Sequence, residues 1–148
     1  MYRTAETFLH VVYEALYAPY GTGYNYEGVN WEVLYKMAEG SKLAVLTYET
    51  AKRLSEDYII SEEILEKWHQ EYLFGTEKAL ECKNAFAEFA EKTGEEGIKY
   101  TVFKGFVLAD LFPNPLYRTS NDTDILIKKE DTAKIAKFLK KLDYQKDT

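Results

Sequence analysis

The run VFKGFVLADLFPNPLYRTSNDTDILI, from Val102 to Ile127, governs the architecture of this chain because β-strand patterns enter a largely helical sequence there. β-Branched and aromatic side chains at residues 100–103 favour a short strand, and residues 105–112 are typical of a short helix. The segment PNP at 113–115 ends that helix, and residues 123–127 predict a second strand. The run therefore predicts a strand, a helix and a strand in that order.

The residues on both sides of this run are expected to be helical. Upstream, apolar residues recur at helical spacing in four stretches, namely 4–18, 31–40, 43–54 and 61–97. Asn30 and Ser61 are suited to cap two of these helices, and Gly75 is a point where the longest could break. Downstream, Asp131 or Thr132 caps a helix that has one apolar face and many lysines on the others.

These patterns predict an α+β protein with two parts. Residues 1–96 are expected to form a helical N-terminal subdomain, and residues 97–148 a second subdomain that holds both strands. Residues 144–148 are expected to lead to a further element that is not in this chain, which would make the second subdomain incomplete at its C-terminus.

Composition limits the function classes. The chain has 148 residues, about one domain, and 46% of them are hydrophobic, with no 18-residue apolar run and no basic-then-apolar leader. We therefore expect a cytoplasmic protein that does not bind membranes. The net charge of −6 argues against a broad nucleic-acid surface, although residues 98–148 carry 10 basic and 7 acidic side chains, against 9 and 18 in residues 1–97.

Asp122 and Asp124 stand one residue apart at the start of the second predicted strand. Residues at this spacing in a strand point to the same face, so the two carboxylates would repel each other unless a cation lay between them. A plain Asn-Asp turn is one interpretation. The other is a site for Mg²⁺ or Mn²⁺, since Mg²⁺ is typically held by one or two carboxylates together with substrate phosphates.

Other residues near the aspartates are suited to phosphate. Lys104 and Gly105 lie where the first strand turns into its helix, and there a glycine lets the backbone approach a ligand while the lysine adds a charge. Arg118 and Ser120 precede the aspartates and offer a guanidinium and a hydroxyl. Each residue alone is equally compatible with a solvated loop.

The ordered set Lys104-Gly105, Arg118 and Asp122-Thr123-Asp124 resembles the signature of the uncharacterised nucleotidyltransferase family, within the DNA polymerase β-like nucleotidyltransferase superfamily. The resemblance is strongest over Ile98–Tyr144. It implies a small mixed sheet flanked by helices, with Asp122 and Asp124 as catalytic residues and metal ligands. It also implies that Lys104 and Gly105 lie near the nucleotide phosphates.

The reaction implied by the resemblance is transfer of a nucleoside monophosphate from an NTP to an unidentified hydroxyl, with Mg²⁺ or Mn²⁺ as cofactor. The acidic balance favours a small molecule or a protein as acceptor over a long nucleic acid. The superfamily usually adds a third carboxylate on a later strand, which we expect to lie outside this chain. The chain would then be a piece of a longer enzyme or an inactive relative.

Two alternatives stay open at this point. One is a catalytically inactive helical module that binds a partner protein, in which the aromatic loop at residues 20–26 forms an exposed adhesive surface. The other is the nucleotidyltransferase of a toxin–antitoxin pair, although such proteins usually have Gly-Ser where this chain has Lys104-Gly105.

Overall fold

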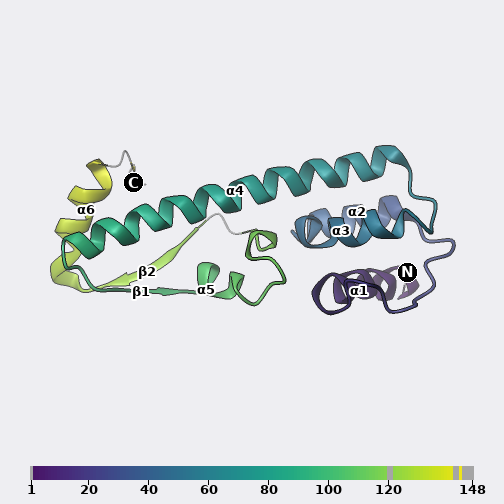
Figure 1. The fold of residues 1–148 in the computed structure, drawn as a ribbon, viewed down its shortest axis with the longest axis horizontal. Coiled ribbons are helices and arrows are strands. Elements are labelled where there is room, and N and C mark those ends of the chain that lie inside the picture. Colours follow the sequence, from purple (N-terminus) through teal and green to yellow (C-terminus); the bar gives the residue numbers. More distant parts are fainter. Residues whose placement is uncertain (1, 120–121, 142–143, 145–148) are drawn as a thin grey trace.

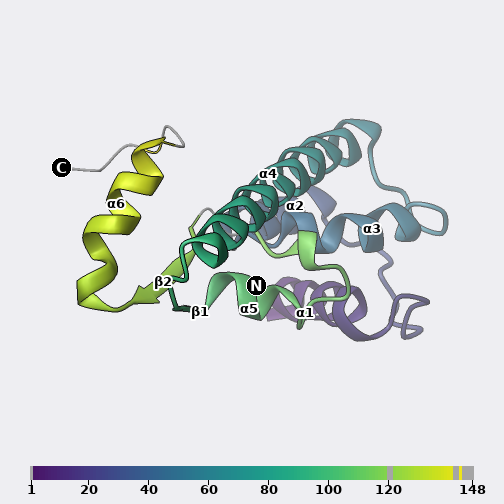
Figure 2. The same cartoon turned by 60° about the vertical axis from the view of Figure 1, so that its left-hand side comes forward.

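The computed structural model describes residues 2–119, 122–141 and 144, and the protein is α+β, built around one long helix (Figure 1). Along the first half of that helix, α4 (Glu62–Glu95), lie the helices α1 (Tyr2–Tyr17), α2 (Trp31–Gly40) and α3 (Ala44–Leu54). Along the second half lie β1 (Tyr100–Phe103), α5 (Gly105–Ala109), β2 (Asp124–Ile127) and α6 (Thr132–Lys141). Figure 2 shows α4 extending from the strands at one end to the helices α2 and α3 at the other.

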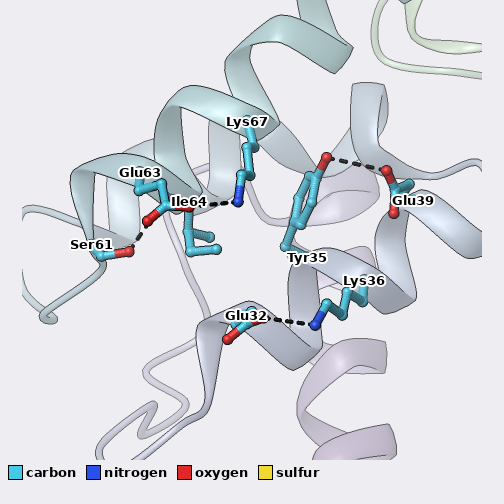
Figure 3. Close-up of polar contacts among 8 residues, drawn as sticks. All are labelled: Glu32, Tyr35, Lys36, Glu39, Ser61, Glu63, Ile64 and Lys67. Carbon is cyan, nitrogen blue, oxygen red and sulfur yellow. Dashed lines mark hydrogen bonds and ion pairs between the residues drawn. The ribbon is translucent and has the colours of Figure 1, made fainter.

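Local capping sets where α2 and α4 begin, as predicted. The side chain of Asn30 accepts a hydrogen bond from the Val33 backbone N–H at 3.2 Å. Ser61 accepts one from the Ile64 N–H at 3.3 Å, and Figure 3 shows both residues. Each cap satisfies a backbone donor that the first turn leaves unpaired, a contribution of about 1 kcal/mol.

The larger hydrophobic core joins α1, α2, α3 and the start of α4. Trp68 is fully buried there, and its indole N–H donates to the Ala44 carbonyl at 3.1 Å. Glu14 is also buried, and its carboxylate accepts hydrogen bonds from Thr22 and Arg53. The fold therefore pairs this buried charge with a cation 39 residues away in the chain.

The Glu14–Thr22 bonds fix the glycine- and tyrosine-rich loop at residues 20–26, for which the sequence allows an exposed adhesive surface. Tyr26 is buried in the larger core, and Tyr24 stacks on His10 with ring centroids 3.9 Å apart. Tyr20 is fully exposed. Tyr24 and Tyr26 therefore pack against the helical region, and Tyr20 is the tyrosine of this loop that stays exposed.

Gly75 does not interrupt α4, which runs without a break from Glu62 to Glu95. The glycine is buried where α4 crosses α3, and a Cβ atom there would lie 2.3 Å from Val45 Cγ2. It would also lie 3.2 Å from Thr119 Cγ2. The glycine is thus a close-approach position, and its cost to helix stability is outweighed by packing.

A second, smaller core lies at the other end of α4. It is formed by Phe89, Ile98 and Ile135, with residues of both strands packed against it. The two strands pair antiparallel, from Tyr100↔Ile127 to Phe103↔Asp124. They form the two-stranded sheet of the described residues. Because α4 contributes to both cores, it holds the strands at a set distance from the helical region.

The helix after β1 is shorter than the predicted span of 105–112. α5 ends at Ala109, and the N–H groups of Leu111 and Phe112 bond to carbonyls three residues back, at 3.2 and 3.0 Å. The chain tightens into a turn there because the residue before Pro113 is disfavoured in helical conformation. Among the helices of the described residues, none is long and apolar enough to span a membrane.

Candidate functional site

The strand register places Lys104 at a sharp turn next to the aspartates. β1 ends at Phe103, which pairs with Asp124, and Lys104 follows with φ 57° and ψ −117°. That backbone conformation favours glycine, and a side chain held in it costs on the order of 1–3 kcal/mol. The strain lies beside the predicted catalytic residues, where strained positions are often found.

This turn directs the ammonium of Lys104 to one of the two carboxylates. Lys104 Nζ lies 3.3 Å from Asp124 Oδ2, with 68% and 35% of the two side chains exposed. A pair this exposed contributes little to stability. Lys104 therefore supplies a cation beside Asp124, one of the two aspartates.

Asp122 lies just before β2, which begins at Asp124. β1 ends opposite Asp124, so no β1 residue is left to pair with Asp122, and strand alternation does not set the direction of its side chain. Asp122 is exposed and lines two neighbouring cavities. The two carboxylates thus enter the site from the strand and from the segment before it.

Two contacts hold the segment that leads to Asp122 against the helical region. The Tyr117 ring lies edge-on to the Tyr72 ring of α4, with centroids 5.9 Å apart, and the Thr119 hydroxyl donates to the Lys42 carbonyl at 3.4 Å. Burial and the hydroxyl of Tyr117 raise the pKa of Tyr72 to about 12. Tyr72 therefore stays protonated at neutral pH and is a packing residue here, not a base.

The smaller cavity, of about 90 Å³, lies between α4, α5 and the segment before Asp122. Its lining includes Gly105, Arg118, Asp122 and Thr123, together with Cys82 and Lys83 of α4. Arg118 Nη1 is buried and has no hydrogen-bond acceptor among the described residues. A buried guanidinium donor that lacks an acceptor is costly, so this cavity is suited to an anionic group.

The larger cavity is an open cleft of about 540 Å³ that shares Asp122 and Ala79 with the smaller one. Its floor is apolar and includes Val45, Gly75 and Ala79. Its walls come from α4, the α2–α3 turn and residues 119 and 122. This volume lies within the range of small-molecule sites, about 300–1,000 Å³.

The structure brings most of the predicted site residues together. Gly105, Arg118 and Asp122 surround the smaller cavity, and Lys104 pairs with Asp124 beside it. Ser120 lies outside the described residues, and α5, with five residues, is too short for a strong helix dipole.

The donor set fits Mg²⁺ or Mn²⁺ under one condition. Asp122 and Asp124 offer the hard carboxylate oxygens that Mg²⁺ prefers. Within residues 2–119, 122–141 and 144, no group of three or more histidine, cysteine, aspartate or glutamate side chains could hold a metal ion. The aspartates would therefore need phosphate oxygens from a nucleotide to complete the coordination, and Lys104 would have to release Asp124.

Sequence reasoning missed the cleft residues Glu39, Lys42, Glu71 and Lys78. They are ordinary charged residues in helices or a turn, and no sequence motif distinguishes them. A glycine at position 75, inside a long helix, was a usable signal, because a glycine in that position often marks close approach of another segment.

Comparison with known protein families matches residues 27–148 to a family described as uncharacterised nucleotidyltransferases. This match extends from the loop before α2 across all residues of the candidate site. No curated protein and no solved structure matches the chain.

Proposed function

Because the chain belongs to the uncharacterised nucleotidyltransferase family, we propose that it transfers a nucleoside monophosphate from an NTP to a hydroxyl acceptor with Mg²⁺ or Mn²⁺. Asp122 and Asp124 are the proposed catalytic residues and metal ligands. Lys104, Gly105, Arg118 and Ser120 are the proposed nucleotide-binding residues. The cytoplasm is the proposed location.

The observation that carries this proposal is the unpaired guanidinium nitrogen of Arg118. It is buried beside Asp122, in a cavity with room for a phosphate group but not for a whole nucleotide. A phosphate oxygen there would accept a hydrogen bond from Arg118 Nη1, for which the described residues offer no acceptor. The glycine at position 105 leaves room for that group because it has no side chain.

Arg118 and Lys104 would then have different roles in the reaction. Arg118 holds a phosphate of the NTP and favours the charge that builds up on the leaving pyrophosphate. Lys104 moves from Asp124 to the phosphates when the nucleotide binds, which frees the Asp124 carboxylate. A metal ion held by Asp122 and Asp124 would neutralise phosphate charge and polarise the reacting phosphoryl group.

Thermal unfolding with and without ATP and Mg²⁺ or Mn²⁺ tests nucleotide binding. A ligand at 100 times its Kd adds roughly 2.7 kcal/mol to the free energy of unfolding. We expect a metal-dependent rise in Tm for the wild type that Asp122→Asn/Asp124→Asn abolishes and Arg118→Met reduces. Asp57→Asn, an exposed change far from both cavities, is the control and is expected to behave as the wild type.

The same rise in Tm in the double variant would refute the assigned roles of Asp122 and Asp124. A rise that does not require the metal would refute the proposed cofactor. If nucleotide is bound, incubation with α-labelled ATP and candidate acceptors then tests transfer itself.

A further inference from the structure

We propose that the larger cleft binds the acceptor and that the acceptor is a small hydroxylated amine, an inference that rests on the proposed function. The cleft is bounded by α4, by the α2–α3 turn and by residues 119 and 122. It gives the helical region a part in the reaction, as the surface that holds the molecule to be modified.

The position of Asp122 assigns the acceptor to this cleft. In the transfer, the acceptor hydroxyl oxygen forms a bond to the α-phosphorus, the bond from that phosphorus to the bridging oxygen breaks, pyrophosphate leaves, and the hydroxyl proton passes to solvent. The attacking and leaving oxygens lie roughly in line on opposite sides of the phosphorus. Arg118 draws the leaving phosphates to the smaller cavity, so the acceptor is expected in the other cavity that Asp122 lines, which is the cleft.

The size and floor of the cleft favour a small molecule. Its volume is about 540 Å³, and Val45, Gly75 and Ala79 give it an apolar floor beside the exposed ring of Phe74. A hexose-sized molecule can place its carbon skeleton on such a floor and its hydroxyls toward Asp122. Gly75 matters twice, because any side chain there would both fill the cleft and strike Val45.

The charges of the cleft wall favour an amine. Glu39 of α2 and Glu71 of α4 both line the cleft, and neither forms an ion pair within the described part of the chain. Figure 3 shows Glu39 accepting a hydrogen bond from the Tyr35 hydroxyl, at 3.3 Å. Burial and then the charges of Glu39 and Glu71 raise the pKa of Tyr35, which indicates that both carboxylates lie near its hydroxyl.

The cations of the wall do not cancel these carboxylates. Lys78 Nζ pairs with Glu81 at 2.7 Å, outside the cleft lining. Lys42 remains as one cation against Glu39 and Glu71. An ammonium group between the two helices would therefore be attracted, whereas a phosphate-rich acceptor such as a nucleic-acid chain would be repelled.

Three hexoses test the proposal: glucosamine, glucose and glucose 6-phosphate, which are cationic, neutral and anionic. Each is titrated into the full chain without nucleotide, and the backbone amide signals of Gly75 and Ala79 are followed by NMR. We expect glucosamine to shift both signals with a Kd about tenfold below that of glucose, the effect of one charge-assisted hydrogen bond, and glucose 6-phosphate to bind weakest.

Glu39→Gln/Glu71→Gln is expected to raise the Kd for glucosamine about tenfold and to leave the Kd for glucose unchanged. The control Glu77→Gln/Glu88→Gln removes two exposed charges of α4 that do not line the cleft, and it should retain the preference for the amine. Equal binding of the three sugars, or no shift at Gly75 and Ala79, would overturn the proposal.

The nucleotide experiment separates the two ways of failing. If ATP and Mg²⁺ raise Tm but the amine does not bind the cleft, the acceptor inference is wrong and the proposed function stands. If ATP itself shifts the Gly75 and Ala79 signals and displaces glucosamine, the cleft holds the nucleoside and the inference is again wrong. If ATP does not bind at all while glucosamine does, the proposed function fails, and the cleft is an amine site without a role as acceptor site.

Discussion

Replacing Gly75 with alanine is expected to destabilise the protein, although the same change in an exposed helix usually stabilises it. In a helix interior, alanine is favoured over glycine by about 1 kcal/mol. At this position, however, the new Cβ would lie 2.3 Å from Val45 Cγ2, more than 1 Å closer than an ordinary carbon–carbon contact of about 3.5–4.0 Å. Val45 is buried and stiff at χ1, so its methyl groups cannot rotate out of the way cheaply.

The expected magnitude follows from these two opposing effects. Overpacking of a core costs about 1–3 kcal/mol, so Gly75→Ala should lower the free energy of unfolding by up to about 2 kcal/mol. Gly94→Ala, in the same helix, is the matched control because a Cβ atom there meets no atom within 4 Å. It should stabilise the protein slightly or leave it unchanged.

Urea unfolding followed by circular dichroism at 222 nm measures both variants. A third variant, Gly75→Ala/Val45→Ala, removes the clashing methyl groups, and the cycle formed with Val45→Ala should give a coupling energy of about 1 kcal/mol or more. If Gly75→Ala stabilised the protein as much as Gly94→Ala, the close approach of α3 to α4 would be wrong.

The remaining predictions concern the charged side chains. Burial raises the pKa of Glu14, but hydrogen bonds from Thr22 and Arg53 outweigh burial and hold it below its usual value of 4.5. A lowered pKa gives stability that is present above the unfolded-state pKa and is lost as the pH falls through the folded-state value. Between pH 7 and 3, the free energy of unfolding should therefore fall less in Glu14→Gln than in the wild type. Arg53→Ala leaves this buried carboxylate without its cation and should cost about 3 kcal/mol in urea unfolding, whereas little loss would show that water replaces the guanidinium. In calorimetry, Lys104→Ala should tighten the binding of Mn²⁺ alone by up to about fivefold and weaken the binding of ATP with Mg²⁺. If both affinities rose or both fell, Lys104 would not move from Asp124 to the phosphates as proposed.

Local sequence determined where α2 and α4 begin. Asn30 and Ser61 each accept a hydrogen bond from a backbone N–H three residues ahead, so the cap and its partner lie within one turn of chain. The strand at Tyr100–Phe103 and the family resemblance were likewise readable, since both depend on neighbouring residues in a fixed order. Such features need no knowledge of distant contacts.

Tertiary structure decided what these elements do together. The pairing of Glu14 with Arg53, the close approach of Val45 to Gly75, and the contact of Lys104 with Asp124 join residues 39, 30 and 20 positions apart. The backbone turn at Lys104 also ended β1 before it could pair with Asp122, which local alternation did not indicate.

The candidate site depends on the same long-range packing. Amphipathic spacing shows that a helix buries one face, but it does not say which surface covers that face. Thr119 and Asp122 reach the cleft because Tyr117 packs on Tyr72 and Thr119 bonds to the α2–α3 turn. The sequence by itself therefore specified the helices, the strands and the charged residues, and only their packing along α4 decided which charges face a common cavity.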